Sequence, residues 1–337
     1  MIVDVHAHIV VPEVTRDAGP ADAWRPAVRR AGGAQVVDLR GREIRSAVGE
    51  FVRIDAILEE AAARGVDRLV LSPWVALLGD ELDLADAERA CRVQNDALAG
   101  LCAAFPQRLS ALGAVPLQRP ELAAARLAAL MGEGALGGVE VAASIRGAWL
   151  GDDRFLPFWE AAEGTGAVVL VHPTTRGFDL PALQRFYLWN SVGNPLETAV
   201  SGAELVMAGV LERFPRLRVV LAHGGGALLA LRGRLRRAHA VQPPARSRLG
   251  GSPDASLRRL HYDSLTHDRG LLRSLVDYAG PERVLLGSDR PFDMGSDDPV
   301  GEVRALGLPP AAERAVLGGN AARLLGLRTA GEEVAAG

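Results

Sequence analysis

The sequence predicts an α/β protein built on a (β/α)8 barrel, the TIM barrel. Eight short apolar runs recur along the 337 residues, with helical patterns between them. Strands that are apolar throughout are typical of parallel sheets covered on both faces. Such a barrel takes about 250 residues, which leaves room for an insertion and for extra C-terminal helices. A doubly wound open sheet is the competing fold, and it is weakened because no Gly-x-Gly-x-x-Gly loop follows the first run.

The predicted elements alternate in order along the chain. The first strand, at residues 3–8, is followed by an irregular insertion over 10–50, in which the runs 34–39 and 43–48 flank a turn at 40–41 and predict a β-hairpin flap. From residue 53 onward the apolar and helical runs repeat regularly. The later strands are predicted at 68–72, 109–115, 138–141, 167–172, 217–223, 259–263 and 283–289. The helices are predicted at 53–64, 86–104, 121–132, 155–163, 196–213, 228–239 and 269–279, with more after 310.

The composition is that of a soluble globular protein, with 48% apolar and 23% charged residues. No linker, repeat or low-complexity run divides the chain, so we expect one domain over residues 1–330 and a frayed tail over 331–337. A net charge of -3 argues against a general nucleic-acid or membrane-surface role. No apolar run approaches the ~20 residues that span a bilayer.

The cysteines and lysines exclude several kinds of chemistry. Cys91 and Cys102 stand alone on one predicted helix, which gives no disulfide framework and favours a reducing, cytoplasmic location. The sequence contains no lysine. A Schiff-base lysine, pyridoxal-phosphate chemistry, a phosphate-loop lysine and a carbamylated lysine bridging two metals are therefore excluded.

The first predicted strand carries two histidines, His6 and His8. On a strand they share one face, and we expect Val3, Val5 and Ala7 on the other. On a helix the same spacing would separate them by roughly 200°. Two imidazoles on one rigid face can chelate a metal ion, although hydrogen-bonded core histidines are the alternative interpretation.

Further donors end other predicted strands. Polar side chains at the C-terminal ends of barrel strands converge on one mouth. Each of the five donors alone could be a packed core residue, but their convergence favours a metal site, in which three imidazoles and a carboxylate suit Zn²⁺ or Mn²⁺ and leave a coordination position open. The set consists of His6 and His8 on the first strand, His172 on the fifth, His223 on the sixth and Asp289 on the eighth. His261 and His267 are interpreted as structural residues or as residues that contact the metal ligands rather than the ion. His239 is interpreted as solvated.

Five motifs carry a family resemblance that runs in order over nearly the whole chain. They resemble the amidohydrolase-related decarboxylases, and most closely aminocarboxymuconate-semialdehyde decarboxylase and its relatives that act on aromatic acids. The motifs are Asp4-Val5-His6-Ala7-His8, Val171-His172-Pro173, Gly193-Asn194-Pro195-Leu196-Glu197-Thr198, Leu221-Ala222-His223-Gly224-Gly225-Gly226 and Leu286-Gly287-Ser288-Asp289-Arg290-Pro291-Phe292.

The resemblance implies a single divalent metal ion, usually zinc and with manganese as the alternative, and no organic cofactor. His6, His8, His172 and Asp289 would hold the ion. His223 would stay unligated as the acid/base, so that His223 and Asp289 form the catalytic pair.

The resemblance also implies substrate contacts. Arg45 in the flap would grip a substrate carboxylate, and Arg234 would reach into a neighbouring subunit's site, which implies a homodimer. Arg234 lies in an arginine-rich helix, so solvated surface charge is the alternative for it. Apart from the resemblance, Phe292 and Trp189 are expected to pack against a flat substrate ring, with plain packing at the barrel mouth as the alternative. The chain departs from the family pattern at Asn190, where tryptophan is usual, and at Arg290, where tyrosine is usual.

These observations predict a metal-dependent, cofactor-free decarboxylase, a carboxy-lyase, acting on a small aromatic or muconate-like carboxylic acid. Loss of CO₂ leaves a carbanion, which a metal ion stabilises and an imidazole can protonate. The main alternative is a hydrolase or hydratase acting on a lactone, amide or enol. A catalytically silent binding protein is a third reading. A nucleic-acid binder using the arginines of residues 232–237 is disfavoured by the net negative charge.

Overall fold

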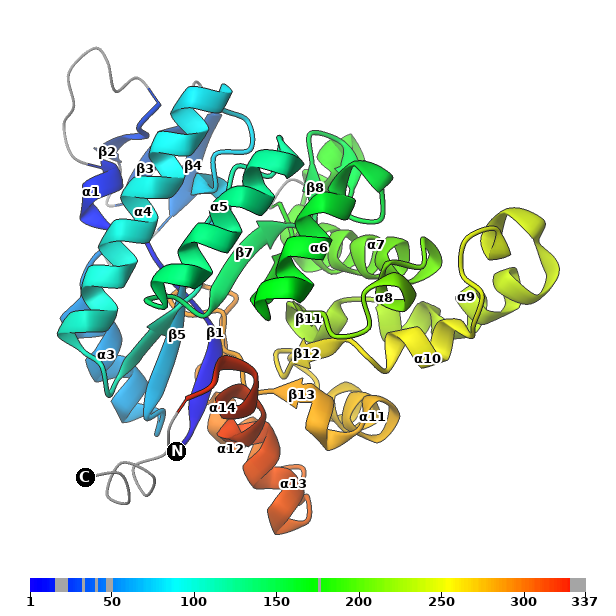
Figure 1. Cartoon of the computed structure of the whole chain (residues 1–337). Helices are drawn as coiled ribbons and strands as arrows, with labels where there is room; N and C mark the ends of the chain where they lie inside the picture. The colour runs from blue at the N-terminus through cyan, green and yellow to red at the C-terminus, as the bar shows by residue number, and fades with distance from the viewer. Residues whose placement is uncertain (16–23, 32–33, 40–41, 47–50, 175–176, 328–337) are drawn as a thin grey trace.

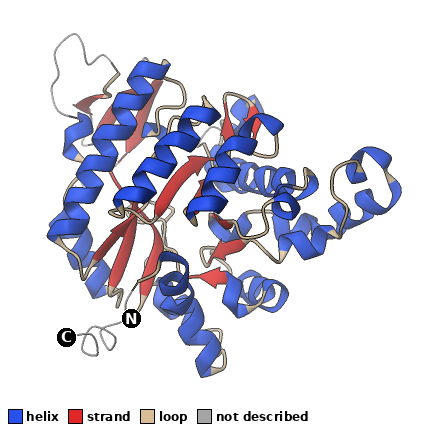
Figure 2. Cartoon of the chain, viewed as in Figure 1, coloured by secondary structure: helices blue, strands red, loops and turns tan. Residues whose placement is uncertain are grey.

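Eight parallel strands close into a barrel in the computed structural model, which describes residues 1–15, 24–31, 34–39, 42–46, 51–174 and 177–327. The barrel strands are β1 (Val3–Ile9), β5 (Arg68–Pro73), β6 (Leu109–Ala111), β7 (Gly138–Ala142), β10 (Val168–His172), β11 (Arg218–Leu221), β12 (His261–Asp263) and β13 (Val284–Leu285). Figure 2 shows these strands enclosed by helices. The predicted TIM barrel is confirmed.

Two ladders and two seams make the closed ring. The ladders run β1-β5-β6 and β13-β12-β11-β10-β7. At one seam Gly113, just after β6, pairs in parallel with Val139 of β7. At the other seam Ala7 of β1 pairs with Arg290, and the Val5 amide donates to the Leu286 carbonyl at 2.9 Å. The first and last strands of the barrel are therefore neighbours.

Helices cover the outside of the barrel. Figure 1 shows α4, α5 and α6 packed in a row against the strands, and α9 extending away from the barrel. The helices are α1 (Pro12–Thr15), α3 (Ile54–Ala63), α4 (Leu84–Ala104), α5 (Pro120–Glu133), α6 (Leu156–Thr165), α7 (Asn194–Met207), α8 (Val210–Arg213), α9 (Leu228–Val241), α10 (Pro253–Leu257), α11 (Arg269–Ala279), α12 (Pro299–Arg304), α13 (Pro310–Arg314) and α14 (Asn320–Leu325). None of the described helices is both long and apolar enough to cross a membrane.

The insertion after β1 contains an antiparallel sheet with one strand more than the predicted hairpin. Its strands are β2 (Ala27–Ala31), β3 (Ala34–Leu39) and β4 (Arg42–Ser46). Val36 and Val37 are buried where β3 lies between its two neighbours. The turn predicted at 40–41 lies outside the described residues. A second, short hairpin, β8 (Ser144–Ile145) and β9 (Ala148–Trp149), follows β7.

Several element boundaries differ from the prediction, and some of them lie near residues with positive φ. The helix predicted at 196–213 is divided by Gly209 (φ +73°), where a Cβ would meet the Arg248 carbonyl oxygen at 2.9 Å. The strands predicted to end at His223 and Asp289 stop earlier, at Leu221 and Leu285, and both predicted end residues have left-handed φ, 56° and 58°. Helices α10 and α12 were not predicted.

Two apolar clusters form the core. The larger one lies between the strands and the surrounding helices. The smaller one fills the inside of the barrel, where Val5, Val168, Leu170 and Val220 meet. Residues alternate between the two along β10, because Val169 and Val171 belong to the larger cluster. This alternation continues the inner face of β10 to His172 at its end.

Candidate metal centre

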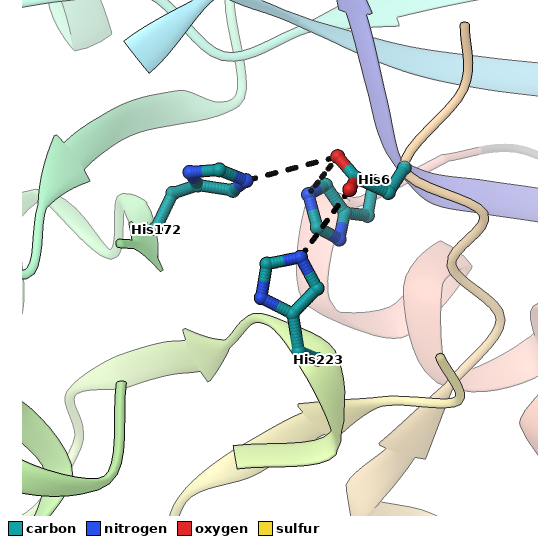
Figure 3. A group of neighbouring side chains, drawn as sticks. His6, His172 and His223 are labelled. Carbon is teal, nitrogen blue, oxygen red and sulfur yellow. Dashed lines mark hydrogen bonds and ion pairs between the residues drawn. The ribbon is translucent and has the colours of Figure 1, made fainter. Parts of the chain in front are cut away.

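Four imidazoles surround the carboxylate of Asp289 at the C-terminal ends of the barrel strands. The Nε2 atoms of His6, His8 and His172 lie 3.3, 3.0 and 3.7 Å from its Oδ1. The Nε2 atom of His223 lies 3.3 Å from its Oδ2. Figure 3 shows the rings of His6, His172 and His223 turned toward this one carboxylate. Strand ends that are far apart in sequence therefore meet at one point, as predicted.

A β-bulge aims the two histidines of β1 into the barrel. The register between β1 and β5 shifts between residues 4 and 7. Val3 and Val5 pack inside the barrel ahead of the shift, His6 and His8 point inward after it, and Ala7 joins the outer core. The prediction that His6 and His8 share a face is right, but the prediction that Val3 and Val5 lie on the opposite face is wrong. An extra residue in a strand reverses the faces beyond it.

The turn that carries His223 has a left-handed backbone over four residues, His223 to Gly226. A Cβ on Gly225 would meet the ring of Tyr262 at 2.8 Å, and one on Gly226 would meet the Pro195 carbonyl oxygen at 2.0 Å. Only glycine tolerates both the positive φ and these close approaches. The glycine run after His223 is therefore explained by its packing against β12 and the start of α7.

The spacing of the donors suits a divalent cation. Donors placed tetrahedrally about 2.1 Å from one ion lie about 3.4 Å apart. The contacts of His6, His8 and His172 with Oδ1 of Asp289, from 3.0 to 3.7 Å, bracket this value. The Nε2 atoms of His6 and His172 are buried and have no hydrogen-bond partner among the described residues. Buried polar atoms without a partner are costly unless an ion or a water completes them.

The opposite ring nitrogens separate three of the histidines from the fourth. In His6, His8 and His172, Nδ1 faces an acceptor, which places the ring proton there and leaves the Nε2 lone pair for a metal ion. The acceptors are Asp263 for His6 (2.6 Å), the Pro73 carbonyl for His8 (3.1 Å) and the Pro173 carbonyl for His172 (2.9 Å).

His223 differs in this respect, because its Nδ1 is buried without a partner in the described part of the chain. Its ring is therefore not fixed in one tautomer. Distance alone does not separate His223 from the other histidines. The donor atoms of His6, His172, His223 and Asp289 all lie within 4.8 Å of one another, and this group does not include His8. The contacts at Nδ1 and the shared contact with Oδ1 favour His8, rather than His223, as the ligand.

The pKa values of Asp289, His172 and His6 are shifted by burial and by the charges around them. Burial would raise the pKa of Asp289, but the surrounding imidazoles, His6 foremost, hold it well below its ordinary value. Burial lowers the pKa of His172 to about 3. A charged carboxylate and a neutral imidazole are the forms of these side chains that bind metal ions. Burial would lower the pKa of His6, but Asp289 and Asp263 raise it well above its ordinary value, so His6 releases a proton when an ion binds.

Two buried carboxylates support the histidines and were missed in the sequence. Asp263 ends β12 and contacts His6; the rule that polar strand ends converge applies to it and would have found it. Glu140, on β7, places Oε2 3.6 Å from Nδ1 of His8, and burial raises its pKa. The glutamate lies in the middle of an apolar run, and a charged residue at such a position was the sequence signal that could have identified it.

The expected substrate residues are only partly gathered at the centre. The ring of Phe292 lies 5.0 Å from that of His8. Arg45 lies on β4, but its side chain is outside the described part of the structure. Arg234 is exposed on α9, and no hydrogen bond or ion pair of the described residues joins it or the half-buried Asn190 to the centre. Arg290 pairs with Glu60 at 3.1 Å and so is bound to α3.

A cavity of about 660 Å³ opens beside the centre. Ala142 and Thr174 line it, and Ala142 is the β7 partner of His172. Trp149 and Glu197 also line it, and the buried carboxylate of Glu197 accepts hydrogen bonds from the amide and the hydroxyl of Thr174 at 2.6 to 2.8 Å. The clustered histidines themselves are not among its lining residues, and the cavity approaches the centre through Ala142 and Thr174, which neighbour His172.

Fold and site together define a (β/α)8-barrel protein with a histidine- and aspartate-lined metal centre at its C-terminal mouth. A family model described as amidohydrolase matches residues 3–327, and the chain belongs to this family. The resemblance inferred from the motifs is thereby confirmed.

Relatives with named activities cover most of the chain. It is 30% identical over 276 residues to 2-amino-3-carboxymuconate-6-semialdehyde decarboxylase of Dictyostelium discoideum, covering 81% of this chain and 76% of that protein. It is 25% identical over 311 residues to gamma-resorcylate decarboxylase of a Rhizobium strain, covering 86% and 88%. The structure of 5-carboxyvanillate decarboxylase from Sphingomonas paucimobilis matches with a TM-score of 0.81 and 23% identity, over 97% of this chain and 99% of that one, and supports the fold.

Proposed function

We propose that this protein is a metal-dependent, cofactor-free decarboxylase of a small aromatic or muconate-like carboxylic acid. One observation carries the proposal: three imidazoles are fixed at Nδ1 and direct Nε2 toward Oδ1 of Asp289, whereas His223 faces Oδ2 with a ring that no Nδ1 contact fixes. Three imidazoles with a fixed tautomer and a carboxylate can hold a metal ion, and the imidazole whose tautomer is not fixed can act as an acid/base beside it. The named activities of the relatives, which are decarboxylases, agree with this reading.

The reaction needs three actions at one place. The bond between the substrate carbon and its carboxylate breaks, the electron pair stays on the carbon, and a proton replaces the lost CO₂. A divalent cation, held by His6, His8, His172 and Asp289, supplies electrophilic stabilisation of the developing charge when it is bound.

The chain's own residues position and protonate the substrate. His223, whose Nε2 atom lies 3.3 Å from Oδ2 of Asp289, delivers a proton to the carbon that loses CO₂. The aromatic side chains of Phe292 and Phe51, 4.7 Å apart beside His8, keep this side of the centre apolar. An environment with little water strengthens each of these interactions.

Finer features belong to the same proposal. We assign zinc as the resident ion, with manganese as the alternative, and the cavity beside Ala142 and Thr174 as the space for the substrate's far end. The β2-β3-β4 sheet acts as a flap that brings Arg45 to the substrate carboxylate, and helices α12 to α14 are extras added to the barrel. The protein works in the cytoplasm as a homodimer in which Arg234 reaches the neighbouring site, and residues 1–330 form one domain.

Product analysis tests the reaction. The metal-loaded protein is incubated with a panel of 2-hydroxybenzoic acids, aminobenzoic acids and muconate-like acids, and the products are examined by mass spectrometry and CO₂ detection. Release of CO₂ with a mass loss of one CO₂ supports the proposal, and His223→Asn should then lower kcat by about 10² to 10⁴. A mass gain of one water with no gas would show a hydrolase or hydratase instead.

A further inference from the structure

Asp263 joins the metal centre to the turn that carries the acid/base. Its side chain is fully buried at the end of β12. Oδ2 accepts a hydrogen bond from Nδ1 of His6 at 2.6 Å and another from the backbone amide of His223 at 2.8 Å. Oδ1 accepts from the amides of Gly224, at 2.6 Å, and Leu265, at 3.1 Å. We propose that Asp263 is a positioning residue that sets the metal affinity of His6 and the placement of His223 at the same time.

The His6 half of the proposal follows from the nature of the acceptor. The Nδ1 atoms of His8 and His172 hydrogen-bond to neutral carbonyl oxygens, and the Glu140 carboxylate lies 3.6 Å from Nδ1 of His8, beyond hydrogen-bond distance. Nδ1 of His6, in contrast, hydrogen-bonds to a carboxylate at 2.6 Å. A carboxylate at Nδ1 fixes the tautomer and makes Nε2 a stronger donor to a metal ion. Among these three rings, His6 is therefore the one whose affinity for the ion depends most on its supporting contact.

The His223 half follows from the backbone. His223 has φ +56°, in a region that residues with a side chain avoid, and Gly224 has φ +61°. The amides of both residues donate to the two oxygens of Asp263. Residues in strained conformations persist only where surrounding contacts hold them. The same carboxylate that supports His6 thus holds the turn from which the His223 ring reaches Asp289.

The carboxylate has no acceptor capacity to spare. Two oxygens offer about four lone-pair sites, and four donors occupy them. Burial acts to raise the pKa of Asp263, but the hydrogen bond and charge of His6 hold it below its ordinary value. Asparagine has the same shape but one acceptor oxygen fewer. Whichever way the amide of Asp263→Asn turned, its NH₂ group would face two N–H donors.

The test combines metal binding with kinetics. The zinc affinity of wild type and of Asp263→Asn is measured by competition with a chromophoric chelator, and kcat and KM are then measured at saturating zinc. We expect about 10- to 100-fold weaker zinc binding. At full occupancy we also expect kcat to fall about tenfold or more while KM stays within about threefold, because the turn of His223 has moved. Asp268→Ala is the control, because it removes the N-cap of α11 and leaves the centre untouched.

The kinetic arm rests on the proposed function, whereas the affinity arm needs no substrate. If the wild type decarboxylates none of the acids tested, the comparison of zinc affinity between the wild type and Asp263→Asn still tests the role of Asp263. Unchanged zinc affinity in folded Asp263→Asn would overturn the proposal, as would full kcat at saturating zinc. If the variant does not fold, nitrogen NMR of the wild type replaces it. A His6 ring protonated at Nδ1 supports the proposal, and one protonated at Nε2 refutes it.

Discussion

His261 is expected to make the protein sensitive to mild acid. It is the first residue of β12 and is 5% exposed. Its Nε2 atom lies 3.2 Å from the guanidinium of Arg283, which donates to it. Burial, followed by the charges of Arg283, Arg323 and Arg218, lowers the pKa of His261 to about 3. In the unfolded chain an imidazole has a pKa of about 6.5.

The direction and size of the effect follow from these two pKa values. Between pH 6.5 and 3 the unfolded chain binds a proton at His261 that the folded protein does not bind, so the free energy of unfolding falls as the pH falls. The contribution is fully present above pH 6.5. Each pH unit below that costs about 1.4 kcal/mol, so the loss between pH 7.5 and pH 5 is about 2 kcal/mol.

Urea denaturation at pH 7.5 and pH 5 measures this loss in the wild type and in His261→Asn, which keeps an acceptor for Arg283. The other titrating groups are the same in both proteins and cancel in the comparison. We expect the wild type to lose about 2 kcal/mol more than the variant over this range. His267→Asn, at an exposed position before α11, serves as the control and should behave as the wild type. Equal losses in the wild type and His261→Asn would refute the reasoning.

Three more predictions concern the site and its supports. Glu197→Ala should lower the free energy of unfolding by about 3 kcal/mol in urea denaturation, because it leaves the amide of Thr174 without its carboxylate partner. Gly226→Ala should lower kcat about tenfold or more in CO₂-release assays, because its Cβ would lie 2.0 Å from the Pro195 carbonyl oxygen and displace the turn of His223. Removing the metal ion with a chelator should lower Tm, and restoring it at about 100 times its Kd should return about 2.7 kcal/mol of stability.

Matched controls separate these effects from general damage. Gly164→Ala adds a Cβ with no heavy atom within 4 Å and should leave kcat unchanged. Thr174→Val completes a double-mutant cycle with Glu197→Ala, and strictly additive losses would contradict the proposed hydrogen bonds. A Tm that does not respond to the chelator in metal-loaded protein would contradict a resident ion that binds the folded state.

The donors of the centre could be predicted from sequence because strand ends of a barrel meet at one mouth. The convergence of His6, His8, His172, His223 and Asp289 needed only the count of strands and the direction of the chain, whereas the assignment of His223 as unligated came from the family resemblance. What could not be predicted depends on contacts across the barrel. The bulge in β1 is defined by pairing with β5, and the part played by Asp263 depends on an imidazole 257 residues away. Neither the bulge nor the role of Asp263 can be inferred from residues that are neighbours in the sequence.

The backbone of the functional residues was the other part that the sequence did not reveal. His223 and Asp289 were placed inside continuous strands, because their apolar neighbours fit a strand pattern. In the structure both leave the strand with positive φ, held by contacts with β12 and β1. Local propensity disfavours that conformation, so only the assembled barrel accounts for it.

The seam between β1 and β13 has a consequence for the order of events during synthesis. His6 precedes Asp289 by 283 residues, so it leaves the ribosome long before Asp289 does. A nascent chain therefore lacks a complete coordination set until Asp289 has been made. Ion capture therefore requires the chain from the first barrel strand to the last, and an ion bound there stabilises the closed ring.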